Sequence, residues 1–127
     1  MSITLKRTGD HFRWKFDSWE TVLALAVEFG WDPSGTNPPR GIHKRDWDAM
    51  DYISPQRQTV TAADASNMAE ALSRSLDKIS NDPTKRLPKR SSKGVRAFWG
   101  WHRAGLQDFV DYCQRGSFRV TDDPFEQ

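Results

Sequence analysis

The sequence has a single cysteine, no long apolar run, and no acidic residue between Pro83 and Arg103. Cys113 alone cannot form an intrachain disulfide bond, which agrees with a reducing compartment. No apolar segment approaches the roughly 20 residues of a transmembrane helix. The first residues alternate polar and apolar side chains, whereas a secretory signal would be continuously apolar. We therefore expect a cytoplasmic protein without a membrane partner.

Recognisable metal-binding motifs are also missing. The histidines lie in three separate segments, without the paired spacing of zinc ligands, at His11, His43 and His102. Three aspartates surround Trp47, but the glycine and the terminal glutamate of a calcium-binding loop do not follow them; they are Asp46, Asp48 and Asp51. We interpret all six side chains as solvated surface or loop residues, and we expect neither a metal nor another cofactor.

No motif for nucleophilic catalysis or phosphate binding stands out. Cys113 falls on an apolar helical stripe, where a thiol is expected to be buried and inert. The segment "PSGT" at residues 33–36 has one glycine and no following lysine, so it does not match a P-loop. These observations favour a protein that binds without catalysis over an enzyme.

Six tryptophans in 127 residues are the most prominent positive feature, and they stand at positions 14, 19, 31, 47, 99 and 101. Large aromatic side chains serve both as core filler and as interface anchors. The aromatic content of 12% beside 28% charged residues is typical of a folded globular chain, and the length fits one domain. We expect a single domain over residues 1–121 and a flexible acidic tail over residues 122–127.

Alternation at the start of the chain predicts a β-hairpin. Ile3 and Leu5 alternate with polar residues, a turn follows at residues 8–10, and Phe12, Trp14 and Phe16 then recur at every second position. The three rings should leave one face of the strand, and Arg13 and Lys15 should face water.

A helix is predicted to follow, with Asp17 or Ser18 as its N-cap and Gly30 just past its end. Its apolar side chains recur at helical spacing and are expected to be buried, with the arc widened by Leu25 and Val27; they are Trp19, Val22, Leu23, Ala26 and Phe29. Residues 31–59 contain prolines, glycines and clustered charge, and we interpret them as an ordered loop held by Trp31, Trp47 and Tyr52, with at most a helical turn over residues 46–52.

Two further helices and a strand are predicted in the second half of the chain. Thr61 should cap a helix that ends before Asn81, and its buried stripe is formed by Ala65, Met68, Ala69, Leu72, Leu76 and Ile79. The last helix begins between Val95 and Arg103 and ends at Gly116, with a stripe of Leu106, Phe109, Val110 and Cys113. Phe118 and Val120 predict a short strand that could pair with the hairpin. Together the elements predict an α+β fold in which a small antiparallel sheet packs with three α-helices.

Four short strings resemble a group of short bacterial proteins of unknown function. They are Ser18-Trp19, "FGWDPSGT" at residues 29–36, "VTAADA" at residues 60–65 and "FVDYCQRGSF" at residues 109–118. The resemblance implies a compact α+β bacterial domain, and no activity comes with it. The basic segment lies outside these strings.

Seven basic residues and no acid occupy residues 83–103, so this basic segment carries +7, while residues 1–82 sum to −2 and residues 104–127 to −3. The cations are Lys85, Arg86, Lys89, Arg90, Lys93, Arg96 and Arg103. Pro83, Pro88 and Gly94 predict a loop for most of the segment. If residues 95–103 are helical, Phe98 continues the buried stripe and Trp99 points to the surface.

This constellation suggests a binding surface. Arginine and aromatic side chains are what protein interfaces favour, so we expect a small bacterial or phage accessory protein, such as an inhibitor, an adaptor or an immunity-like factor, that binds a protein partner. The expected contact residues are Lys89, Arg90, Lys93, Arg96, Trp99 and Arg103, with Trp47 and the 31–47 loop as a second candidate. Nucleic-acid binding through residues 85–103, with Trp99 and Trp101 stacking on bases, is the alternative. A solvated basic loop without a function also explains the charge.

Overall fold

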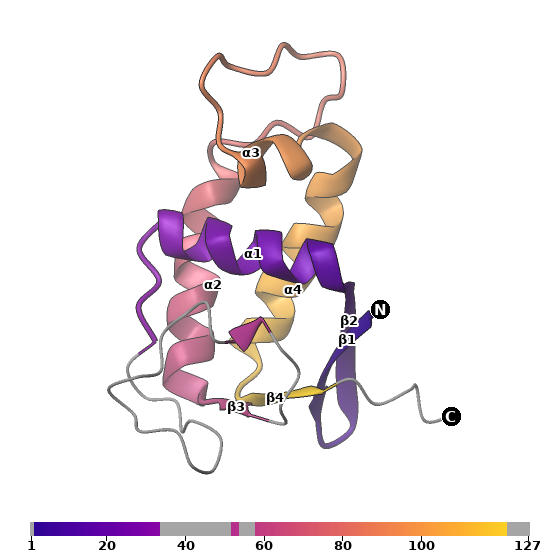
Figure 1. Cartoon of the computed structure of the whole chain (residues 1–127), viewed down its shortest axis with the longest axis vertical. Helices are drawn as coiled ribbons and strands as arrows, with labels where there is room; N and C mark the ends of the chain where they lie inside the picture. Colours follow the sequence, from indigo (N-terminus) through magenta and orange to yellow (C-terminus); the bar gives the residue numbers. More distant parts are fainter. Residues whose placement is uncertain (1, 34–51, 54–57, 122–127) are drawn as a thin grey trace.

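The computed structural model describes residues 2–33, 52–53 and 58–121 and has an α+β fold (Figure 1), as the sequence predicts. The elements in chain order are β1 (Ser2–Arg7), β2 (Asp10–Lys15), α1 (Phe16–Glu28), β3 (Thr59–Val60), α2 (Ala62–Leu76), α3 (Lys93–Ala97), the 3₁₀ helix η3 (Gly100–His102), α4 (Arg103–Gln114) and β4 (Phe118–Thr121). Among these residues, no helix has the length and apolar character that crossing a bilayer requires.

The four strands form one antiparallel sheet in the order β2-β1-β4-β3. The predicted hairpin is present, and Gly9 in its turn has a φ of +78°. The predicted C-terminal strand does pair with β1, through Leu5 and Val120 among others. Strand β3 was not predicted, because two residues are too few to show a strand period.

Strand alternation separates the sheet into two chemically different faces. The inward positions are apolar and are occupied by Ile3, Leu5, Phe12, Trp14, Val60, Phe118 and Val120. On the outward face of β2 lie Arg13 and Lys15, both exposed as predicted. Phe16, which the alternation placed in the strand, is instead the first residue of α1.

One aromatic cluster joins the inward face to the helices. Phe109 of α4 lies 5.3 Å from the ring of Phe12, 5.5 Å from Trp14 and 5.9 Å from Trp19. Its ring also packs 6.3 Å from Phe118 of β4. Helix α4 therefore contacts β2, β4 and α1 through a single side chain.

Helix α1 begins earlier and ends as predicted. Asp17 and Ser18 are not its N-cap: the N-cap is Lys15, whose side chain makes no capping bond, and both predicted caps lie inside the first turn. At the other end, Gly30 has a φ of +104° and its N–H donates to Val27 O, while Trp31 N–H donates to Ala26 O. This pair of hydrogen bonds is the Schellman motif that a glycine at this position allows.

The buried side of α1 is narrower than predicted. Trp19, Val22, Leu23, Leu25 and Ala26 are buried, and Phe29 is half-buried. Val27 is 41% exposed, so it does not widen the apolar arc. Of the two residues predicted to widen the apolar arc, Leu25 is buried and Val27 is not.

Helix α2 follows its prediction closely. The Thr61 hydroxyl accepts a hydrogen bond from Asp64 N–H at 3.2 Å, and all six predicted stripe residues are buried. Helices α2 and α4 pack against each other, and Cys113 Sγ lies 4.0 Å from Met68 Sδ. The thiol is therefore part of the helix interface.

Hydrogen bonds from two buried indoles fix the positions of Trp31 and Tyr52. Trp19 Nε1–H donates to Tyr52 O at 2.8 Å, and Trp31 Nε1–H donates to Asp64 O at 3.0 Å. Trp31 and Tyr52 are both buried, with ring centroids 5.7 Å apart, so both contribute to the core. Trp47 lies outside the described residues, as does the predicted turn over residues 46–52 apart from Tyr52.

The last predicted helix is present as α4, which begins at Arg103 and is followed by Gly116 with a φ of +127°. A separate short helix, α3, was not predicted. Gly100 has a φ of +69° and interrupts the helical path between the two. Gly94 of α3 is buried, and a Cβ atom placed on it would lie 2.9 Å from carbons of the Leu25 side chain.

The close approach of α3 to α1 gives a matched pair of substitutions. Gly94→Ala is expected to lower the free energy of unfolding by about 1–2 kcal/mol, because the added methyl group overpacks against Leu25. Gly105→Ala in α4 meets nothing within 4 Å and is expected to raise it by about 0.4–1 kcal/mol. Urea titration monitored by circular dichroism measures both. Equal effects of the two substitutions would contradict the packing of α3 on α1.

A second pair concerns the buried indole nitrogens. Trp19→Phe leaves the Tyr52 carbonyl without its donor and is expected to cost about 1–3 kcal/mol more than Trp14→Phe. The Trp14 N–H is buried and has no acceptor among the described residues, so its removal loses no hydrogen bond. The midpoints of thermal unfolding provide the comparison. A larger loss for Trp14→Phe would show that the Trp19 hydrogen bond contributes little.

Candidate functional site

Residues 83–92 of the basic segment form a loop, here called the basic loop, that extends beyond α3 at one end of the molecule (Figure 1). Six of the seven cations of the basic segment are exposed, and these are Lys85, Arg86, Lys89, Arg90, Lys93 and Arg96. Ser92 caps α3, because its hydroxyl accepts a hydrogen bond from Val95 N–H at 3.2 Å. Arg96 Nε donates to Ser91 O at 3.0 Å, so this side chain folds back toward the loop.

Trp99 holds the base of the loop. Its indole N–H donates to Lys85 O at 3.1 Å, and the half-buried ring packs against the core. The N–H of Gly100 donates to Ser80 O at 2.7 Å. Trp99 was expected to point to the surface if residues 95–103 were helical, but α3 ends at Ala97 and the backbone of Trp99 is extended, with a ψ of 139°.

Arg103 has a structural contact as well. Its Nε donates to Ile79 O at 2.9 Å, and its Nη2 approaches Leu76 O at 3.4 Å. Leu76 is the last residue of α2 and Ile79 lies three residues beyond it, where a positive charge also complements the helix dipole. The predicted contact residues therefore have different roles. Trp99 and Arg103 support the loop, whereas Lys89 and Arg90 are exposed on the loop and Lys93 and Arg96 are exposed on α3; Trp47 lies outside the described residues.

Trp101 is the exposed indole. It is 80% exposed, and Val27 is the only other large apolar side chain that is exposed among the described residues. Trp101 lines an open groove of about 500 Å³, here called the Trp101 groove. Its other lining residues come from β2, α1, α3, η3, α4 and the residue after α3, and they are Trp14, Asp17, Ser18, Thr21, Ala97, Phe98, His102 and Gly105.

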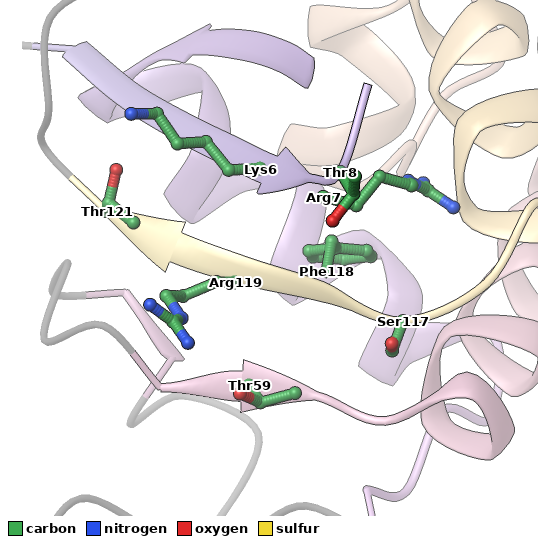
Figure 2. A pocket seen from close by; sticks show the side chains of 8 residues that line it. All are labelled: Lys6, Arg7, Thr8, Thr59, Ser117, Phe118, Arg119 and Thr121. Atoms are coloured by element: carbon green, nitrogen blue, oxygen red, sulfur yellow. The ribbon is translucent and has the colours of Figure 1, made fainter. Parts of the chain in front are cut away.

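A second groove, with basic and hydroxyl side chains in its lining, lies at the sheet and was not predicted from the sequence. It has a volume of about 450 Å³ and runs over β1, β4 and β3 (Figure 2). It is lined by Lys6, Arg7, Thr8, Thr59, Ser117, Phe118, Arg119 and Thr121, with no acidic side chain among them. The alternation in β2 already showed basic residues facing water, but the chain separates them from Arg119 by more than a hundred residues.

An ionic and aromatic contact closes one end of this sheet. Arg7 Nη2 donates to Tyr112 O, and its guanidinium lies 3.8 Å from the centre of the Tyr112 ring. Asp10 pairs with Arg115 at 3.0 Å and with Arg7 at 3.8 Å. Tyr112 in turn donates to Leu5 O at 3.0 Å, and its burial raises the pKa of the phenol above the ordinary value. These groups fasten the hairpin to the end of α4.

Cys113 is buried on the α4 stripe, as predicted. Burial raises the pKa of its thiol far above the ordinary value, because a thiolate would lose its hydration there. Among residues 2–33, 52–53 and 58–121, no three His, Cys, Asp or Glu side chains gather to hold a metal ion. His43, Asp46, Asp48 and Asp51 lie outside these ranges.

Comparison with known proteins gives no relative: no protein-family model, no curated protein and no solved structure matches this chain.

Because Cys113 is buried, its thiol is expected to react slowly with labelling reagents in the native protein. Native protein is expected to react with a bulky aromatic disulfide reagent only as fast as it opens, whereas urea-unfolded protein should react at once. Raising the pH from 7 to 9 should change the native rate little, because the opening of the fold, and not the ionisation of the exposed thiol, limits the reaction. Absorbance of the released thiolate measures the rate. Labelling of the native state within seconds would show an accessible, reactive thiol.

Proposed function

We propose that the protein acts by binding another protein, without catalysis, and that the Trp101 groove is the contact site. The observation that carries the proposal is the 80% exposure of Trp101 beside a groove. Tryptophan is the side chain most enriched among residues that dominate interface energies. Leaving an indole in water is unfavourable, and a partner's surface would remove that cost.

The walls of the groove support a preformed site. Trp14 packs 5.5 Å from Phe109 and 5.9 Å from Phe98, so two of the rings beside Trp101 belong to the aromatic cluster. Rigid walls reduce the entropy lost on association. Among the described Phe and Trp rings that line the groove, Trp101 alone is exposed.

The surrounding charge indicates the chemistry of the partner. Lys93 and Arg96 are exposed on α3, the helix that leads into the groove at Ala97. An acidic rim on the partner would complement these cations and speed its association. We therefore expect a partner that presents an apolar side chain within an acidic surface.

Single-stranded nucleic acid on the basic segment is less well supported. Such binding uses several exposed rings, on which successive bases stack. Here Trp99 is half-buried and bonded to Lys85 O, so Trp101 alone is available beside these cations among the described residues.

A hydrolytic reaction in the groove is also less well supported. Asp17, Ser18 and His102 line it together, and these are the residue types of a catalytic triad. A triad needs hydrogen bonds from serine to histidine and from histidine to the carboxylate. In the described part of the chain, no hydrogen bond joins any two of them; Thr21, not His102, donates to Asp17, through the Asp17 carbonyl at 2.9 Å.

Quantitative affinity capture followed by titration tests the proposal. The tagged protein should retain a specific protein, and Trp101→Ala should weaken the binding of that purified partner by about 2 kcal/mol or more, roughly 30-fold in Kd. Val27→Ala is the control, because it truncates the other exposed apolar side chain and should leave Kd unchanged.

Two results would contradict the proposal. One is equal Kd for the wild type and Trp101→Ala. The other is an equal loss for both variants, which would indicate a general effect of reduced surface apolarity instead of a specific site.

A further inference from the structure

We propose that the basic loop binds the phosphate backbone of double-stranded nucleic acid, as a second site that does not depend on the Trp101 groove. Figure 1 shows the loop extending beyond α3, away from β3 and β4. Exposed cations are what duplex binding without sequence preference uses, because each one that meets a phosphate releases a counterion.

The cations of the loop are available to an external anion. All four are exposed, and they are Lys85, Arg86, Lys89 and Arg90. Within the part of the chain that the structure describes, their side chains make no hydrogen bond or ion pair. The neighbouring acid is Asp82, whose carboxylate accepts hydrogen bonds from the Thr84 hydroxyl at 2.7 Å and from Thr84 N–H at 2.9 Å. These two bonds and the charge of Lys85 lower the pKa of Asp82. The charges of Lys89 and Arg90 therefore remain unpaired.

Contacts at three places support the backbone of the loop. The Leu87 side chain packs against the core, and the Trp99 indole N–H donates to Lys85 O at 3.1 Å. Ser91 Oγ donates to Pro88 O at 2.7 Å across the turn that contains Lys89 and Arg90. A loop that is already ordered loses less entropy when it binds.

Arg90 occupies a backbone position that favours glycine. Its φ is +66°, and among the described residues it is the only one other than glycine with a positive φ. Glycine or asparagine is usual at such a turn position, because a Cβ atom is disfavoured there. The exposed guanidinium makes no contact within the described chain that would offset this cost. Unfavourable backbone conformations are concentrated at functional sites, so the position favours a binding role for the Arg90 side chain.

The positive surface continues into an open cavity at the base of the loop. The cavity has a volume of about 430 Å³ and lies where the end of α2, the loop and the start of α4 meet. Lys78, Lys85 and Arg103 bring three cations to its lining, against the single carboxylate of Asp77. Lysine and arginine are the side chains that contact phosphate oxygens most often. A backbone that follows the loop would therefore meet further cations near the core.

The loop favours a duplex over a single strand. Sites for single strands stack bases on exposed aromatic rings. The loop contains no aromatic residue, and the nearby Trp99 is half-buried with its indole N–H bonded to Lys85 O. Contacts are therefore limited to the backbone, and a duplex has the higher density of phosphates, with one charge per about 1.7 Å of its axis.

An acidic protein is a poorer match to the loop. Protein interfaces are depleted in lysine and depend on a central apolar or aromatic anchor. The leucine of the loop, Leu87, packs against the core instead of standing free. Trp101 offers such an anchor, but it lies beyond α3 in the groove proposed for the protein partner.

Fluorescence anisotropy with a labelled 20-base-pair DNA duplex tests the inference, together with an RNA duplex and the single strands of the same sequence. The wild type should bind a duplex at low salt, more tightly than either single strand. Lys89→Gln with Arg90→Gln should weaken duplex binding roughly 10-fold or more near 0.1 M salt and lower the slope of log K against log salt by about 2.

A matched variant separates the loop from net charge. Lys15→Gln with Arg119→Gln removes the same charge from exposed positions of β2 and β4, and it should leave duplex affinity within about twofold of the wild type. Circular dichroism establishes that each variant is folded.

Two glycine variants separate binding from structure at the turn. Arg90→Gly should weaken duplex binding while the midpoint of urea unfolding stays unchanged or rises, because glycine adopts a φ of +66° without a Cβ penalty. Lys89→Gly, at a position whose φ is not positive, should weaken binding and lower the midpoint. Unchanged duplex affinity in Arg90→Gly would contradict the role of this side chain.

Four results would overturn the inference. They are no duplex binding by the wild type at 50 mM salt, an equal or larger loss in the sheet variant, single-strand binding as tight as duplex binding, and loss of a protein partner instead of the duplex from the loop variant. Trp101→Ala should bind the duplex as the wild type does, so failure of this site and failure of the Trp101 groove are distinguishable.

Discussion

The packing around the Phe109 ring is the constraint on which the rest of the structure depends. Rings from β2, α1 and β4 meet this one side chain of α4. A ring at the centre of such a cluster removes a large apolar surface from water and fixes the angles of its neighbours. The hairpin and α1 at the start of the chain are distant in sequence from α4 and β4 near its end, and this contact packs the four elements together. The hydrogen bond from Tyr112 to Leu5 O adds a directional contact beside it.

The two proposed surfaces flank α3, which this packing holds in place. Before α3, Leu87 packs against the core and the Trp99 indole donates to Lys85 O, so the basic loop is supported while its cations face water. Helix α3 itself packs on α1 through Gly94, and Phe98 after it joins the cluster. The following residues then turn back into α4, which places Trp101 at the surface.

Local patterns were enough to predict much of the fold. The hairpin alternation, the Thr61 cap, the Gly30 terminus and the stripes of α2 and α4 depend on neighbours within a few residues, and the structure confirms each. The start of α1 and the exposure of Val27 were wrong, because tertiary packing rather than capping preference fixed where that helix begins and which side it buries.

The candidate sites were harder to predict, because they combine residues that only the fold brings together. Lys78, Lys85 and Arg103 line one cavity because the end of α2, the basic loop and the start of α4 meet there, which no local pattern specifies. Trp99 and Trp101 are two residues apart, but α3 ends before Trp99, and the extended backbone of Trp99 lets the first ring pack on the core while the second is exposed. A helical pattern alone had suggested the reverse for Trp99.

The contacts at the base of the basic loop make the stability of the domain depend little on the length of the loop. Ser80 O accepts a hydrogen bond from Gly100 N–H, and Lys85 O accepts one from the Trp99 indole. The two ends of the loop are therefore joined where they leave the core. The closure entropy of a loop rises only slowly with its length. The exposed stretch of residues 88–90 can therefore be lengthened or accept an inserted peptide while the helices keep their packing.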